Sequence, residues 1–359
     1  MFEDITIQSH KGPYSVRFRE NLLEDPAPML AGKPHFIVDA NVARLYAGPL
    51  AAALAMPGTV LVDATEDSKS LQNIIPVIER LVANRVRRGD VLVAIGGGIT
   101  QDITCFIAST LLRGVDWKFV PTTLLAQADS CIGSKSSINL GEAKNILGTF
   151  NPPREVIVCS RFLDTLEDRD LRSGIGEILK VHAIESADAF DQLAKDYDRL
   201  TSDRRLLLDY VRHALLVKKR YIEEDEFDRG VRNVFNYGHS FGHAIESATE
   251  FRIPHGVAVS MGADMANRIA SLRGMIGEPH YRRMHGALRK NYRAFAGEPI
   301  PEDRLLAALM KDKKNTATNL VLVLPAGPVA TIQRTEVPPD DRFRAQCRTF
   351  LEEVRNERD

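Results

Sequence analysis

The sequence predicts an α/β protein of two domains, an N-terminal domain built on a parallel β-sheet and a C-terminal domain that is largely α-helical. The chain has 359 residues, which at about 150 residues per domain suggests two domains. Short apolar runs alternate with helical patterns in the first half, as a parallel sheet with crossover helices requires. From about Asp168 the pattern is mostly helical, so we place the domains at residues 1–167 and 168–359.

The strands expected in the first half are short and apolar. Near-continuous apolar runs such as V-L-V-A-I indicate a sheet that helices cover on both faces. One intervening helix is marked by Leu71, Ile74, Ile75, Ile78 and Leu81, which recur at spacings of three and four. The expected strands are residues 35–38, 59–62, 91–95, 118–120 and 156–158.

The second half is expected to hold a long helix and a pair of strands. Apolar residues between Leu206 and Ile222 follow a helical period with a charged outer face. Residues 320–324 and 329–333 should pair as strands, because Pro325-Ala326-Gly327-Pro328 between them is typical of a turn.

Composition excludes several classes of protein. The 47 Lys and Arg residues nearly balance the 48 Asp and Glu residues, which gives no general attraction to nucleic acid or to an acidic membrane surface. The N-terminal segment lacks a secretory signal, and no stretch approaches the roughly 20 apolar residues of a membrane span. The four cysteines are scattered without a C-x-x-C pair, so we expect free thiols in a soluble cytoplasmic protein.

The first candidate site is Gly96-Gly97-Gly98, between an expected strand and an expected helix. Glycines there let the backbone approach a ligand closely, and the free N–H groups at a helix start favour phosphate. A tight turn without a ligand is the alternative. Polar residues also follow the ends of earlier strands, where ligands of open α/β sheets collect, although solvated loops would look the same. These residues are Asp39, Asn41, Glu66 and Lys69.

The second candidate site is Pro121-Thr122-Thr123 and the loop expected after it. Apolar residues are interleaved with the polar ones and would anchor the loop, leaving the Lys head groups free to face a cavity. A mobile surface loop is the alternative. The polar residues are Asp129, Lys135, Asn139, Lys144 and Asn145.

The third candidate site combines carboxylate, amine and imidazole groups. Glu177 and Lys180 are three residues apart on a helical pattern, and His239 and His243 are four apart, so each pair shares a helix face. Two imidazoles and one carboxylate are a common ligand set for zinc or a similar ion. The alternative is that these histidines only cap or pack. The full set is Glu177, Lys180, Arg232, Asn236, His239, His243 and His255.

Over about residues 35–325 the chain resembles the 3-dehydroquinate synthase family of sugar-phosphate cyclases. The resemblance rests on segments that together are highly specific. They are G-G-G-I-T-Q-D, R-G-V-D-W-K-F-V-P-T-T-L-L-A-Q-A-D-S, G-S-K-S-S-I-N, K-N-I-L-G, G-I-G-E-I-L-K, N-Y-G-H-S-F-G-H-A-I-E, P-H-G-V-A-V and D-K-K.

The resemblance implies a dehydroquinate synthase-like fold with a Rossmann-like NAD-binding domain, bound NAD, a zinc or cobalt ion, a phosphorylated keto-sugar substrate and a homodimer. It assigns as metal ligands Glu177, His239 and His255. It assigns to NAD Asp39, Asn41, Glu66, Lys69, Gly97, Gly98, Asp102, Thr122, Thr123, Asp129, Lys144 and Thr165. It assigns to the substrate Lys135, Asn145, Lys180, Lys218, Arg232, Asn236, His243 and Lys314, with Arg113 delivered by the neighbouring subunit.

The implied chemistry has no net redox change. A ring hydroxyl is oxidised by NAD while the metal polarises its oxygen, phosphate leaves, the hydride returns, and an intramolecular aldol closes a carbocycle. Lys135, Lys180 and His243 would stabilise developing negative charge.

Four departures from the family pattern bear on the substrate. Typical members read Gly-Gly-Lys-Thr at Gly133-Ser134-Lys135-Ser136 and His-Pro at Leu140-Gly141, with a Gly at Gln101 and a Glu at Val257. Leu140 removes a donor near the expected substrate, whereas Lys218 and Arg232 match positions that bind a substrate carboxylate. A cyclase for sedoheptulose 7-phosphate or glucose 6-phosphate in cyclitol biosynthesis is therefore one alternative. A metal-dependent polyol dehydrogenase and a catalytically silent interaction protein are others.

Overall fold

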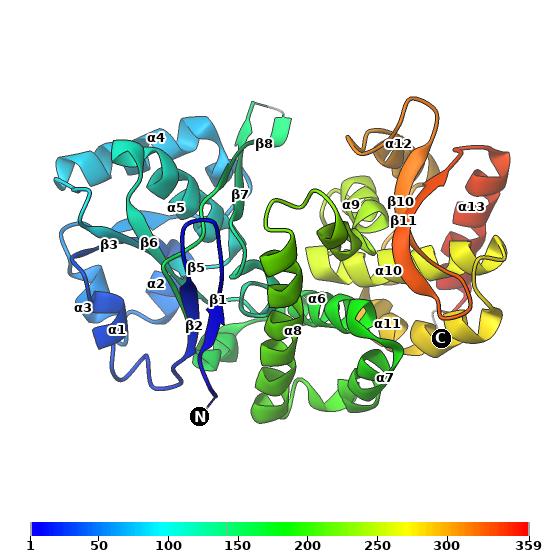
Figure 1. Cartoon of the computed structure of the whole chain (residues 1–359), viewed down its shortest axis with the longest axis horizontal. Coiled ribbons are helices and arrows are strands. Elements are labelled where there is room, and N and C mark those ends of the chain that lie inside the picture. The colour runs from blue at the N-terminus through cyan, green and yellow to red at the C-terminus, as the bar shows by residue number, and fades with distance from the viewer. Residues whose placement is uncertain (1, 142, 358–359) are drawn as a thin grey trace. The chain divides into compact units, whose positions relative to one another are not determined.

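The computed structural model describes residues 2–141 and 143–357, which form two compact units. One unit comprises Met1–Leu166 and Val211–Arg229, and the other comprises Glu167–Tyr210 and Gly230–Asp359. Residues 211–229, which the sequence placed in the second domain, therefore group with the first unit. Figure 1 shows the elements in chain order.

The first unit is built on a seven-stranded sheet with the order β1-β2-β9-β6-β5-β3-β4. All neighbouring strands are parallel except β1 and β2. The strands are β1 (Ile5–Ile7), β2 (Tyr14–Phe18), β3 (Pro34–Asp39), β4 (Val60–Val62), β5 (Val91–Gly96), β6 (Asp116–Pro121) and β9 (Glu155–Val158). The five predicted strands and the parallel sheet are confirmed, and the antiparallel pair β1–β2 is additional.

Helices cover both faces of this sheet, which explains why its central strands are apolar throughout. On one face α2 and α3 pack with alternate residues of β3 and β5, including Phe36 and Ile95, while α4 and α5 lie on the other (Figure 1). In α4 the buried residues are Ile74, Val77 and Leu81, whereas Ile75 of the predicted apolar stripe is exposed. The helices are α1 (Ala27–Leu30), α2 (Ala40–Leu45), α3 (Ala51–Leu54), α4 (Leu71–Ala83) and α5 (Gly98–Thr110).

The segment after Thr123, predicted as a loop anchored by apolar residues, is regular secondary structure, so its prediction as a loop is wrong. It forms a π-helical turn, η3 (Ala126–Ser130), and a hairpin of β7 (Lys135–Leu140) and β8 (Ala143–Phe150). Ile138 is fully buried and β7 packs on α5, although K-S-S-I-N-L has little strand character of its own.

The second unit is a helical assembly around α10 (His255–Leu272), which is buried on nearly all sides by α6, α9, α11 and α13. The predicted long helix is confirmed as α8 (Arg204–Glu224), of which residues 204–210 belong to this unit and residues 211–224 to the first. The predicted strand pair is confirmed in this unit as β10 (Leu320–Ala326) and β11 (Thr331–Val337). The remaining helices are α6 (Asp168–Glu185), α7 (Ala187–Asp196), α9 (His239–Ala248), α11 (Glu278–Tyr292), α12 (Glu302–Met310) and α13 (Asp341–Asn356).

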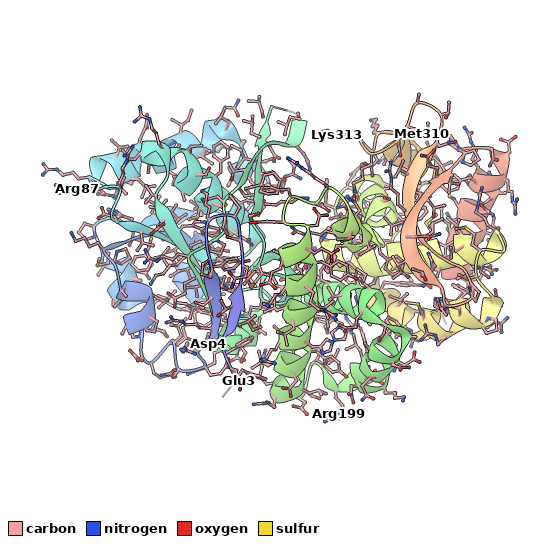
Figure 2. All side chains as sticks on the ribbon, in the orientation of Figure 1. Glu3, Asp4, Arg87, Arg199, Met310 and Lys313 are labelled. Carbon is pink, nitrogen blue, oxygen red and sulfur yellow. The ribbon has the colours of Figure 1, made fainter. Side chains whose placement is uncertain are left out.

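Charged side chains lie mainly at the periphery of the described chain, where Figure 2 labels Arg87 and Arg199 among others. All four cysteines are buried, and their thiols are free, as the sequence predicted. Among the described residues no helix is long and apolar enough to cross a bilayer.

Candidate functional site

A buried carboxylate and a buried amine lie side by side on α6. Glu177 and Lys180 are 1% and 3% exposed, and Lys180 Nζ lies 2.5 Å from Glu177 Oε2. Burial opposes ionisation of Glu177, but Lys180, His239 and His255 together outweigh it and lower the pKa of Glu177 well below its usual value. The helix therefore offers an anionic ligand inside the unit.

Three imidazoles gather beside this carboxylate. His239 and His243 lie on α9 and His255 begins α10, with ring centroids 5.3 to 5.6 Å apart. One ring nitrogen from each lies within 4.8 Å of the others. The Nε2 atoms of His239 and His255 are 3.6 Å and 3.3 Å from Glu177 Oε1. The structure thus brings together the three residues assigned as metal ligands, with His243 adjoining them.

This group fits a divalent cation. Ligand atoms bound tetrahedrally at about 2.0–2.1 Å from zinc lie about 3.4 Å apart, close to the separations between Glu177 and the two histidines. Burial lowers the pKa of His239 well below its usual value, so its neutral ring offers a lone pair. Burial also opposes a charge on His255, but the carboxylates of Glu177 and Glu246 outweigh it and raise its pKa to about 10. A positive charge is therefore stabilised where a cation would bind.

Close helix packing holds these ligands together. A Cβ atom on Gly176 would lie 1.9 Å from the carbonyl oxygen of Gly256, and one on Gly256 would lie 1.8 Å from that of Ser173. Only glycines permit this approach of α6 to α10, which brings Glu177 near His255. Gly238, with φ +77°, adopts the left-handed conformation that starts α9 at His239.

The other residues assigned to the substrate in this unit adjoin the cluster along the chain. Arg232 is buried, and Asn236 precedes His239 by three residues. Lys314 Nζ donates to Asn236 Oδ1 at 2.8 Å. Lys180 also lies 5.4 Å from the centroid of the Phe235 ring. The amine, guanidinium and amide groups of this region are suited to binding a ligand that carries several negative charges.

In the first unit, the residues assigned to NAD follow the carboxyl ends of successive parallel strands. Asp39 ends β3, Thr122 follows β6, and Thr165 follows β9 and contacts the Tyr46 hydroxyl at 3.0 Å. Asp39 caps α2 by accepting the N–H groups of Asn41 and Val42. Parallel strands share one carboxyl edge, so these side chains lie at one edge of the sheet.

The glycine turn fits a phosphate group. Helix α5 begins at Gly98 with Gly97 as its N-cap, and no side chain caps it. Its first N–H groups are therefore available to an anion, and the helix dipole favours negative charge there. A Cβ atom on Gly97 would lie 3.0 Å from Thr123 Cγ2, so a side chain would crowd the turn.

A hydrogen-bonded network joins residues assigned to NAD with one assigned to the substrate. Buried Lys69 donates to Asp102 Oδ2 at 3.1 Å and to Asn145 Oδ1 at 2.9 Å. Asn139 donates to Glu66 at 2.8 Å and accepts the N–H of Asn145, which has φ +52°. Asn145 is thus held by Lys69 and Asn139.

The network predicts a pH effect on stability. Burial raises the pKa of Asp102 to about 6, although Lys69 opposes the shift. Because this folded-state pKa exceeds the unfolded value, the contribution of Asp102 is full below about pH 4 and is lost as pH rises through 6. Between pH 4 and 7 we expect the free energy of unfolding of Asp102→Asn to decline by roughly 2–3 kcal/mol less than that of the parent protein. Urea unfolding of both proteins between pH 4 and 7 measures it, and parallel curves would contradict it.

Two further cations of the first unit have acidic partners. Lys218, 7% exposed, lies 2.6 Å from the Asp129 carbonyl oxygen and 2.9 Å from its Oδ1. Lys135 contacts Asp228, a residue that the sequence analysis missed. Asp228 stands in the acidic run D-E-F-D, which no spacing distinguishes from a solvated loop.

Arg113 lies at the opposite end of the sheet from the glycine turn. It precedes β6 by three residues at that strand's amino end, whereas Thr122 and Thr123 follow its carboxyl end. Six residues of strand separate these ends by about 20 Å. Arg113 therefore cannot reach the carboxyl edge of its own sheet.

Glu246 is the second functional candidate that the sequence analysis missed. Its Oε2 lies 3.1 Å from Nδ1 of His255. The signal was present, because Glu246 follows His239 by seven residues and His243 by three, which places all three on one face of a helix.

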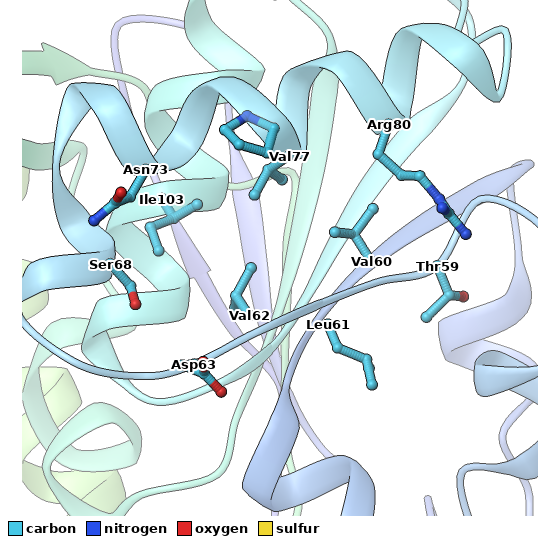
Figure 3. A pocket seen from close by; sticks show the side chains of 11 residues that line it. Thr59, Val60, Leu61, Val62, Asp63, Ser68, Asn73, Val77, Arg80 and Ile103 are labelled. Carbon is cyan, nitrogen blue, oxygen red and sulfur yellow. The ribbon is translucent and has the colours of Figure 1, made fainter.

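A separate pocket of about 510 Å³ lies along β4 and α4 (Figure 3). Its lining includes Val60, Val62, Val77 and Ile103, with Arg80 and Asp63 toward opposite ends. None of its 11 lining residues is among those assigned to NAD, the metal or the substrate, although Ser68 and Ile103 adjoin Lys69 and Asp102 along the chain.

Comparison with known proteins gives concordant matches over most of the chain. The family described as 3-dehydroquinate synthase N-terminal matches residues 59–173, and the family described as 3-dehydroquinate synthase C-terminal matches residues 174–315. A 3-dehydroquinate synthase from Rhodospirillum rubrum is 38% identical over 315 residues, covering 84% of this chain and 82% of that protein.

Solved structures of related enzymes have the same fold. The 2-epi-5-epi-valiolone synthase from Streptomyces hygroscopicus, with NAD+ and Zn2+ bound, is 29% identical at a TM-score of 0.81, covering 96% of this chain and 97% of that one. A 2-deoxy-scyllo-inosose synthase complexed with carbaglucose-6-phosphate, NAD+ and Co2+ has a TM-score of 0.80 at 23% identity, covering 99% and 100%, and supports the fold alone.

Proposed function

Because this chain belongs to the 3-dehydroquinate synthase family, we propose that it is an NAD- and divalent-metal-dependent sugar-phosphate cyclase that eliminates phosphate and closes a carbocycle. The observation that carries the proposal is the buried Glu177 carboxylate flanked by His239, His255 and Lys180. A silent interaction protein has no need to bury these groups together, since burying charges costs free energy.

The cofactors are proposed from the donor groups and from a relative. Glu177, His239 and His255 would hold zinc or cobalt, and the valiolone synthase relative was solved with NAD+ and Zn2+. When bound, NAD accepts and returns a hydride while the metal acts as a Lewis acid on the substrate oxygen. The N-terminus of α5 would take the NAD pyrophosphate, with the other assigned residues around it.

The chain's own cations and amides would bind and orient the phosphorylated substrate. Lys180 lies beside the metal ligands and would stabilise negative charge that develops on the substrate. Arg232 and Lys218 would bind a carboxylate, and His243 would hold or move a proton. The remaining proposed contacts are Lys135, Asn145, Asn236 and Lys314.

We further propose a cytoplasmic homodimer in which Arg113 serves the partner subunit's site. Its place at the amino end of β6 supports this, because it lies far from the carboxyl edge of its own sheet. The four buried free thiols are compatible with a reducing compartment.

A cyclase for a sugar phosphate without a carboxylate is the second candidate. It is favoured by Leu140, which is 42% exposed on β7 and has an apolar side chain where family members have histidine. The carboxylate-binding assignment of Lys218 and Arg232 favours the 3-dehydroquinate reaction. The two candidates differ in substrate and share the chemistry.

Phosphate release tests the proposal directly. Protein with NAD and Zn2+ or Co2+ is incubated with the seven-carbon shikimate-pathway acid phosphate, its amino analogue, sedoheptulose 7-phosphate or glucose 6-phosphate. We expect inorganic phosphate and a carbocycle from one of them without accumulation of NADH, because the hydride returns within each turnover.

Absorbance at the NADH band is recorded in the same reactions. Stoichiometric NADH would identify a dehydrogenase and overturn the cyclase proposal. The substrate that releases phosphate decides between the two cyclase candidates.

A further inference from the structure

One ring nitrogen of His255 is held by a carboxylate outside the proposed ligand set. Glu246, in the last turn of α9, is 9% exposed, and its Oε2 lies 3.1 Å from His255 Nδ1. Among the described residues, His255 is the one group that contacts this carboxylate through a hydrogen bond or ion pair. A buried carboxylate is costly unless it is paired, so His255 is the partner that stabilises Glu246 in this position.

The two nitrogens of His255 face different carboxylates. Nδ1 points to Glu246 and Nε2 lies 3.3 Å from Glu177 Oε1. A carboxylate can only accept, so Glu246 holds a proton on Nδ1, and Nε2, which faces Glu177, is the nitrogen left to bind an ion together with that carboxylate. The contact therefore fixes both the tautomer and the ring orientation.

His239 is held in a comparable way by a weaker partner. Its Nδ1 lies 3.3 Å from the carbonyl oxygen of Tyr237, and its Nε2 also faces Glu177 Oε1. A neutral carbonyl polarises an imidazole less than a carboxylate does. His255 is thus the ligand whose basicity is raised by an outer charge.

We propose that Glu246 is a positioning residue of the metal centre, which orients His255 and strengthens its Nε2 as a ligand. The inference rests on the proposed function, because it concerns the ion that Glu177, His239 and His255 would hold. Outer carboxylates of this kind typically change metal affinity by about 10- to 100-fold.

The test is Co2+ binding to metal-free protein, measured by competition with a chelator and by the visible absorption of the bound ion. We expect Glu246→Ala to weaken Co2+ binding by about 10- to 100-fold and to alter the absorption band. Glu246→Gln keeps an acceptor but loses the charge, so it should fall between Glu246→Ala and the parent.

Glu250→Gln is the matched control. Glu250 lies four residues further along, is exposed and pairs with Arg304, so this variant should bind Co2+ as the parent does. If Glu246→Ala does not fold by circular dichroism, Glu246→Gln decides. Parent-like affinity and absorption in the folded Glu246 variants would overturn the role of Glu246 alone, whereas failure of the parent to bind Co2+ would overturn the proposed metal site.

Discussion

Replacing His239 by alanine should abolish metal binding and, with it, cyclase activity. The change removes one of three ligands and leaves Glu177 and His255, whose facing atoms are 3.3 Å apart. Two ligands cannot close a tetrahedral site, so the loss should exceed the roughly 10- to 100-fold typical of removing an outer partner. Metal content after dialysis against limiting Zn2+, and Co2+ titration of metal-free protein, measure the effect.

His280→Ala is the control for this prediction. His280 lies on α11 in the same unit, contacts Arg283, and is outside the histidine cluster. It should retain its metal and its activity. Unchanged metal content in a folded His239→Ala protein would contradict the ligand assignment.

Replacing Gly256 by alanine should destabilise the protein strongly and disrupt the metal centre. The new Cβ would lie 1.8 Å from the Ser173 carbonyl oxygen, a backbone atom that cannot rotate away. Helices α6 and α10 would have to separate, at a cost of at least about 3 kcal/mol. Because Glu177 lies on α6 and His255 on α10, Co2+ affinity should fall as well. Urea unfolding of the metal-free protein and Co2+ titration measure both effects.

A second glycine-to-alanine variant separates packing from helix propensity. Gly286 lies in α11, and a Cβ atom there would have no neighbour within 4 Å. Gly286→Ala should be neutral or up to about 1 kcal/mol more stable. Equal stability of the two variants would show that the α6–α10 contact is less tight than the structure describes.

Local patterns predicted the helices and apolar strands that carried the signal, although Ile75 of the predicted stripe in α4 is exposed. Glu177 with Lys180 and His239 with His243 are on shared faces because helical spacing is a local property of the chain. The parallel strands were predictable because burial on both faces makes them apolar throughout. β7 was not, since its polar residues become a strand only by pairing with β8 and packing on α5.

The partners of the site residues were mostly beyond sequence reasoning. Lys218 and Asp129 are 89 residues apart, and Lys135 and Asp228 are 93 apart, so no local period connects either pair. Glu246 was within reach by helical spacing, but its contact with His255 depends on how α9 meets α10. The NAD, metal and substrate assignments themselves stay predictions.

The sequence by itself determined the fold class, the parallel strands, the family and the residue types of the proposed metal centre, because these follow from short-range periodicity and motif. Only the tertiary structure decided which polar groups face one another. Helix α6 meets α10 at Gly176 and Gly256, where backbones touch without side chains between them. That approach places Glu177 next to Nε2 of His255, while Glu246 contacts Nδ1 on the other side of the ring. This geometry is set by long-range packing, which no spacing along the chain encodes.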